Sequence, residues 1–127
     1  WAYTHKDHTR DERHDAWLEQ EKRFGGGVVD WSGIPEDLRR KSWHNILHFF
    51  VVPFYFIEYG FAQLGALQVA VNAEKDPAKA LKMYKDALAL GPQRDTFGLY
   101  EAAGAEFIPT KEKVRELMNW IRDGLGF

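Results

Sequence analysis

The fold of this protein is decided by one long apolar stretch, FFVVPFYFIEYGFAQLGALQVAV, at residues 49–71. Apolar residues occupy nearly every face of the helix that this stretch would form, so we expect other helices to surround it. Pro53 predicts a boundary or a kink, and the long helix should therefore cover Phe54 to about Ala73. Glu58 falls inside this helix, where a buried carboxylate is costly unless it is paired or hydrogen-bonded.

A membrane span is the alternative interpretation of the same stretch, because its length would suffice to cross a bilayer. Polar residues recur through it, however, at Glu58, Gln63 and Gln68, and such side chains are costly inside a membrane. The segments around it are amphipathic, as in helices that face water. We therefore predict the central helix of a larger helical protein and no membrane partner.

The composition is that of a globular protein. A chain of 127 residues suffices for one compact core, so residues 1–127 are expected to form a single helical region. Seventeen basic residues are spread among nineteen acidic ones without a basic stripe, which argues against a nucleic-acid partner. Cysteine is absent, which excludes disulfides and thiolate metal sites and fits a reducing compartment, so we expect a cytoplasmic location.

The first residues, Trp1-Ala2-Tyr3, contain neither an initiator methionine nor a signal-peptide pattern. We expect the chain to be a piece of a longer protein, and we expect residues 1–8 to be flexible. The histidines of this charged N-terminal region, namely His5, His8 and His14, are expected on the solvated surface.

The sequence on either side of the apolar stretch predicts further helices and no strand pair. Asp76 is an N-cap followed by Pro77 at the first helical position, and three glycines from Gly25 end the first helix. The flanking helices are expected at residues 9–24, 35–52, 76–90 and 95–103, and from Thr110 to a break at Gly124 and Gly126. The fold class predicted is all-α, an irregular bundle of five to six helices.

Two histidines in the segment HNILH, His44 and His48, have the i, i+4 spacing of the metallopeptidase motif H-E-x-x-H. Asn45 occupies the position of the glutamate that serves as general base, so the segment is not a working copy of that motif. No third ligand is evident nearby. We interpret both histidines as ordinary helix residues with respect to metal, and a structural zinc pair is the alternative.

Residues 43–68, WHNILHFFVVPFYFIEYGFAQLGALQ, resemble a segment of the oligoendopeptidase F and thimet-oligopeptidase-like zinc peptidases. The family run looks like H-x-F-x-x-P-F-Y-x-I-[D/E]-Y-x-x-A-Q. The residues that match it, with the spacing kept throughout, are His48, Phe50, Pro53, Phe54, Tyr55, Ile57, Glu58, Tyr59, Ala62 and Gln63. The resemblance extends more weakly over the rest of the chain.

The resemblance implies a helical metalloendopeptidase that cleaves oligopeptides in a deep channel, with zinc held by H-E-x-x-H and a further glutamate. None of these ligands is in this sequence. They would lie upstream, in a catalytic part outside this chain, so the isolated chain should bind no zinc and hydrolyse no peptide. His48, Tyr55 and Tyr59 would bind the substrate backbone and stabilise the tetrahedral intermediate. Phe56 is a departure, because many relatives carry another tyrosine there.

The spacing of Tyr55 and Tyr59 adds an argument of its own, since i, i+4 residues share one face of a helix. A phenol or imidazole N–H that is preset toward a developing oxyanion can lower the barrier by about 3 kcal/mol. The alternative is that both tyrosines are core aromatics whose hydroxyls have found partners.

A second class of function is an adaptor. Residues 62–92 look like one tetratricopeptide repeat, with Leu64-Gly65 in a first helix, Ala80, Tyr84, Ala87 and Leu88 in a second, and Pro92 at its close. Such repeats bind peptides and partner proteins. No second copy occurs about 34 residues away, although repeats need neighbours to bury their faces.

The faces around Phe49, Phe50 and Tyr55 should be uncovered if the upstream part is absent. A large exposed apolar patch promotes association, so we expect the isolated chain to self-associate through these faces.

Overall fold

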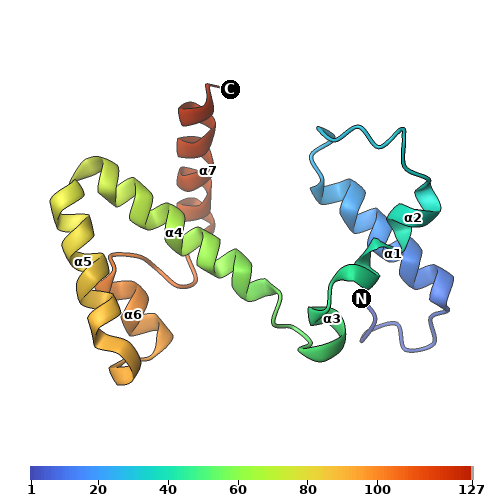
Figure 1. Ribbon diagram of the computed structural model, residues 1–127, viewed down its shortest axis with the longest axis horizontal. Coiled ribbons are helices and arrows are strands. Elements are labelled where there is room, and N and C mark those ends of the chain that lie inside the picture. The colour runs from blue at the N-terminus through green and yellow to red at the C-terminus, as the bar shows by residue number, and fades with distance from the viewer. Residues whose placement is uncertain (127) are drawn as a thin grey trace. The chain divides into compact units, whose positions relative to one another are not determined.

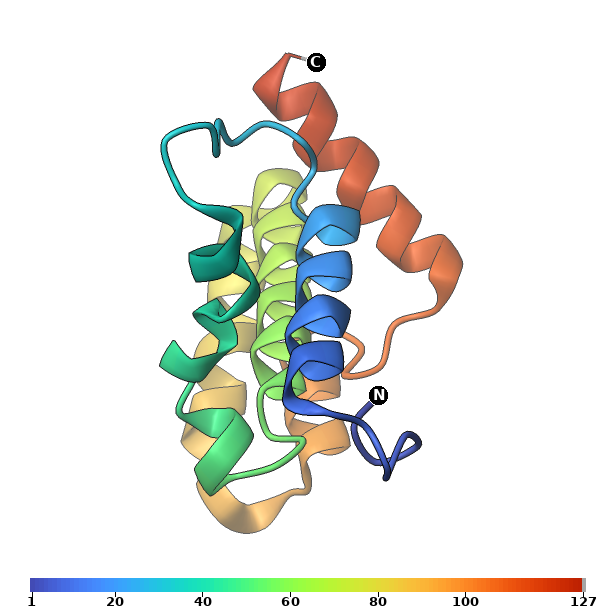
Figure 2. The same ribbon diagram turned by 90° about the vertical axis from the view of Figure 1, so that its right-hand side faces the viewer.

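The computed structural model describes residues 1–126 and contains only helices, turns and loops over that range (Figure 1, Figure 2). Its α-helices are α1 (Arg10–Phe24), α2 (Glu36–Arg40), α3 (His48–Val51), α4 (Ile57–Lys75), α5 (Pro77–Leu90), α6 (Thr96–Ala102) and α7 (Lys111–Leu125). Short 3-10 helices are η1 (Ser42–Asn45) and η2 (Gly91–Gln93). The predicted all-α class is confirmed, with seven α-helices in residues 1–126 because the segment expected as one helix at 35–52 is divided.

The chain packs as two compact units, of which the first comprises residues 1–55 and the second begins at Phe56. The first unit contains α1 to α3, and the second contains α4 to α7 (Figure 1). The expectation of one continuous helical region stays a prediction.

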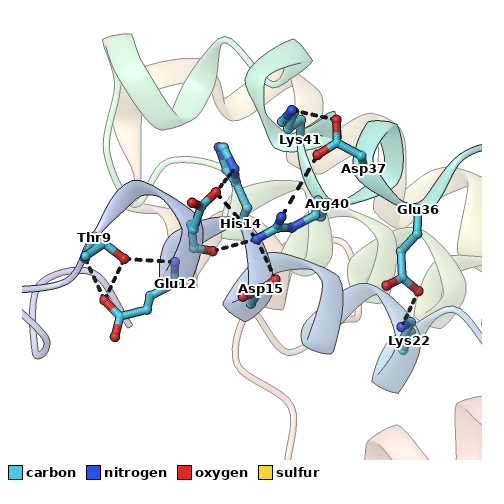
Figure 3. Close-up of polar contacts among 10 residues, drawn as sticks. Thr9, Glu12, His14, Asp15, Lys22, Glu36, Asp37, Arg40 and Lys41 are labelled. Carbon is cyan, nitrogen blue, oxygen red and sulfur yellow. Dashed lines mark hydrogen bonds and ion pairs between the residues drawn. The ribbon is translucent and has the colours of Figure 1, made fainter.

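The ends of α1 are specified by local sequence. The backbone N–H of Glu12 donates to the Thr9 hydroxyl at 3.2 Å, and the Thr9 backbone N–H donates to the Glu12 carboxylate at 2.7 Å (Figure 3). These reciprocal bonds form a capping box, which satisfies two N–H groups that the helix leaves unpaired. Beyond the helix, Gly26 and Gly27 have φ values of 66° and 68°, in the left-handed region that favours glycine.

Ion pairs join α1 to α2 in the first unit. Arg39 donates two hydrogen bonds to the Glu21 carboxylate, at 2.9 and 3.1 Å, and both side chains are largely buried. Lys22 pairs with Glu36 at 2.9 Å (Figure 3). Both bonds leave the single guanidinium nitrogen Nη2, and this charge-assisted pair ties α2 to α1.

The segment that follows α2 is broken because Trp43 turns into the core of the first unit. Trp43 is buried, and its ring stacks on Phe50 at a centroid distance of 5.4 Å. Ser42 accepts a hydrogen bond from Trp17 Nε1 at 2.9 Å, which ties η1 to α1. At Ile46 the backbone is extended, with φ −94° and ψ 90°, and the helix predicted over residues 35–52 is therefore wrong.

Small residues allow the helices of the second unit to approach closely. The buried residues include Gly65 on α4, Ala80 and Ala87 on α5, and Leu117 on α7. The long helix α4 contacts both α5 and α7, and α6 packs on α5 (Figure 1, Figure 2). Asp76 caps α5 by accepting from Lys79 N at 3.0 Å, as the sequence predicts.

A buried glutamine ties the loop after α6 to α4. Gln68 donates to the Glu106 carbonyl at 2.9 Å and accepts from the Glu106 backbone N–H at 2.9 Å. One turn further along, Asn72 donates to the Gly104 carbonyl at 2.8 Å. These amides satisfy backbone groups that no helix or strand pairs, so they set the path of the chain from α6 to α7.

The long apolar helix differs from its prediction in three respects. It begins at Ile57 rather than Phe54, and it continues to Lys75. Glu58 is exposed on its first turn, so the expected cost of a buried carboxylate does not arise. α5 and α7 cover only part of it, and Ile57 and Tyr59 are exposed.

The last helix also runs further than expected, because Gly124 lies within it and the left-handed cap is Gly126. Across residues 1–126, every helix is too short or too polar to span a bilayer.

Candidate functional site

A tight turn in the first unit brings together two of the residues singled out from the sequence. His48 is the first residue of α3, and Tyr55 follows that helix in the turn over residues 52–56. Their rings are stacked, with centroids 5.9 Å apart and planes at 4°. Tyr55 is 45% exposed, and His48 is half-buried.

The turn contains a strained residue. Phe54 has a φ of 68°, the only positive φ outside glycine in the described part of the chain. A bulky residue in the left-handed region costs roughly 1–2 kcal/mol, and it persists only where the surrounding structure determines it. Phe54 directly follows Pro53, and its ring lies 5.1 Å from that of Tyr3. This conformation is what turns Tyr55 back toward His48.

Tyr59 lies on the first turn of α4, in the second unit, and is 55% exposed. Its ring contacts that of Phe56 edge to face at 5.6 Å. Tyr55 lies two residues before α4, so the prediction that Tyr55 and Tyr59 share one helical face is wrong. The reason is that the turn after Pro53 includes Tyr55, so the helix begins only after it.

The apolar residues around this turn are partly exposed. Phe49, Phe50 and Tyr55 are all exposed by at least a third of their surface, together with Leu47, Val51, Val52, Phe54, Phe56 and Ile57.

The two histidines with metal-ligand spacing are separated by the break in the chain. His44 lies in η1, and His48 begins α3 on the other side of the extended Ile46. They are therefore not successive-turn neighbours on one helix, which corrects the helical interpretation of HNILH. Within residues 1–126, no three histidine, aspartate or glutamate side chains come together as metal ligands.

Sequence reasoning missed one histidine. His14 was expected on the solvated surface, yet it is only 2% exposed and lies in the core of the first unit between α1, α2 and η1. The signal was its spacing, because His14, Trp17 and Leu18 share one face of α1 at i, i+3 and i+4. Most other residues of this helix are charged, so the segment has no obvious apolar stripe.

The second unit contains an apolar groove with a volume of about 560 Å³ between α4, α5 and α6. Its lining is dominated by small and aliphatic side chains, with two tyrosines as the polar groups. Representative lining residues are Ala62, Gly65, Val69, Tyr84, Leu88 and Tyr100.

Comparison with protein-family models, with curated proteins and with solved structures yields no match for this chain.

Proposed function

We propose that this chain is the C-terminal helical part of a zinc-dependent oligopeptidase, to which it supplies substrate-binding and oxyanion-stabilising side chains. The observation that carries the proposal is the stacked pair of His48 and Tyr55, held by a strained turn. Two residues that the family resemblance assigns to substrate are thus neighbours in space. The proposal includes a cytoplasmic location, which the absence of cysteine supports.

The proposed roles follow from the chemistry of peptide hydrolysis. When a nucleophile attacks the peptide carbonyl, negative charge grows on the carbonyl oxygen, and a preset donor stabilises it. Tyr59 is proposed to donate from its phenol to that oxygen. His48 and Tyr55 are proposed to bind the substrate backbone as well. Since residues 1–126 bring no set of three metal ligands together, the zinc of the whole enzyme is assigned to its other part, and no step here depends on it.

The coding sequence upstream of this chain is the first test. The proposal requires an H-E-x-x-H motif followed by a further glutamate in that region. An upstream region without that motif would contradict it.

The second test is kinetic and uses the whole enzyme. Tyr59→Phe should lower kcat by roughly a hundredfold with KM nearly unchanged, because an oxyanion bond exists mainly in the transition state. Tyr84→Phe is the matched control, since Tyr84 is another partly exposed tyrosine of the second unit and should be silent. If Tyr59→Phe keeps full kcat with normal zinc content, Tyr59 is part of the scaffold.

His48 and Tyr55 require a separate comparison. His48→Gln should change both kcat and KM, because the imidazole is proposed to bind ground-state and transition-state groups alike. Tyr55→Phe keeps the ring that stacks on His48 and removes only the hydroxyl. A fall in activity would assign the hydroxyl to the site, whereas full activity with a loss of about 1 kcal/mol in stability would leave Tyr55 as a packing residue.

A peptide-binding adaptor is the second candidate function, and the apolar groove of the second unit favours it. The exposed residues Leu81, Tyr84 and Leu88 follow one another along α5 at helical spacing. In this case oligopeptide binding, measured by calorimetry, should be lost in Tyr84→Ala and retained in His48→Gln. The peptidase proposal predicts the opposite pattern.

A further inference from the structure

His14 is a buried histidine whose two ring nitrogens have no hydrogen-bond partner in the structure. It lies on α1, with the ring of Trp43 at 6.1 Å and the ring of His44 at 5.3 Å between centroids. A neutral imidazole can be accommodated there at moderate cost, whereas an imidazolium would be a charge buried without a hydrogen bond. The position therefore discriminates between the two protonation states of His14.

The charges that face His14 come from every element packed around it. Arg40 is held by Asp15 at 2.7 Å and donates to the Asp11 carbonyl at 3.1 Å (Figure 3). The Asp11 carboxylate lies 3.8 Å from His14 Nδ1 and 3.6 Å from Arg40, so one anion is shared by two groups. The charged and titratable groups around it include Arg10, Asp11 and Asp15 on α1, Asp37 and Arg40 on α2, and Lys41 and His44 beside and within η1.

We propose that His14 is an acid-sensitive lock of the first unit, and that its protonation releases α1 from α2 and η1. A positive charge at His14 would repel Arg40, Lys41 and a protonated His44. It would also draw Asp11 away from Arg40, weakening a contact that joins α1 to α2. The inference is independent of the proposed peptidase function, because none of these residues belongs to the proposed substrate site.

The direction of the pH effect follows from the burial of His14. Loss of hydration lowers the pKa of His14 below its usual 6.5, with further lowering by His44 and Arg40, and Asp11 opposes this only in part. The unfolded or released state therefore binds a proton at a higher pH than the packed state. The contribution of His14 to stability is complete above pH 6.5 and is lost as the pH falls from 6.5 through the lowered pKa.

The test uses the whole chain, labelled for NMR, between pH 7.5 and 5.0. The ring resonances of His14 should titrate below the usual histidine pKa of 6.5. Amide protection in α1, corrected for the intrinsic pH dependence of exchange, should fall by roughly tenfold or more over this range. Protection in α5, which belongs to the other unit, should not change.

Variants separate the lock from general acid sensitivity. His14→Leu and His14→Gln cannot titrate, and whichever of them folds should keep the protection of α1 constant down to pH 5.0. His5→Gln is the matched control and should behave as the unmodified chain does. The proposal is overturned if His14 titrates at or above pH 6.5 while the α1 amides stay protected. It is also overturned if the non-titrating variants lose amide protection in α1 over the same pH range.

Discussion

At the scale of single residues, a glycine on α4 leaves room for a ring of α6 in the second unit. A Cβ added to Gly65 would lie 2.5 Å from Cε1 of the Tyr100 ring, a separation that packed carbon atoms do not reach. The Tyr100 ring is itself held edge to face by Phe107 at 5.0 Å, and it has little freedom to withdraw. The absence of a side chain at Gly65 is thus what lets α6 approach α4.

Gly65→Ala should therefore destabilise the second unit by roughly 1–3 kcal/mol, the usual cost of overpacking. Urea unfolding followed by circular dichroism measures the change. Gly60→Ala is the control on the same helix, because nothing lies within 4 Å of a Cβ there. It should stabilise α4 by up to about 1 kcal/mol through helix propensity alone. Equal changes in stability for the two substitutions would show that the Tyr100 ring moves aside at little cost and that the predicted overpacking does not occur.

At the scale of elements, α1 and α7 both have a threonine as N-cap, but the residues that face these threonines differ. Thr9 is the N-cap of α1, and the third residue of that helix is Glu12, whose carboxylate bonds back to Thr9. Thr110 is the N-cap of α7, and the third residue of that helix is Lys113. Hydrogen bonds from the backbone and the side chain of Thr9 lower the pKa of Glu12 below its usual 4.5.

This contrast predicts a pH-dependent cap on one helix only. Thr9→Ala and Thr110→Ala should each cost about 1 kcal/mol at neutral pH. Because the pKa of Glu12 is lowered by folding, its contribution is present above pH 4.5 and is lost as the pH falls through the lowered value. The cost of Thr9→Ala should shrink over that range, while the cost of Thr110→Ala should not. Thermal unfolding at pH 7 and pH 3.5 measures the loss of stability in each variant. An equal decrease of both losses at pH 3.5 would contradict the prediction.

At the scale of the whole molecule, most apolar residues between Leu47 and Ile57 in the sequence are exposed. Exposed apolar residues promote association between copies of a chain. We predict concentration-dependent self-association of the isolated chain, detectable by sedimentation velocity. Val51→Glu, at a residue that is 63% exposed, should weaken it at least several-fold.

Val28→Glu is the control, since Val28 is 88% exposed but lies in the loop between α1 and α2. It introduces the same charge away from the apolar run and should leave association unchanged. If both substitutions act equally, net charge rather than the apolar run governs association. A chain that stays monomeric at high concentration would contradict the prediction itself.

Much of the helical framework could be predicted because helix ends are chosen by neighbouring residues. Asp76 is an N-cap in the structure, as the sequence predicts. Thr9 and Thr110, where the sequence predicts two other helices to begin, are N-caps as well. A cap acts within one turn, so its effect can be inferred without knowledge of the rest of the chain. α4 starts at Ile57 rather than at Phe54 because the turn that follows Pro53 continues through Phe56.

The sequence by itself therefore determined the all-α class, the N-cap of α5 and the residue types available for a site. Tertiary structure alone decided that His14 is buried, that Trp43 interrupts the helix over residues 35–52, and that Tyr55 turns back onto His48. Each of these depends on residues distant along the chain, as in the hydrogen bond from Trp17 to Ser42. Local propensities differ by less than 1 kcal/mol per residue, and packing between distant segments outweighs them.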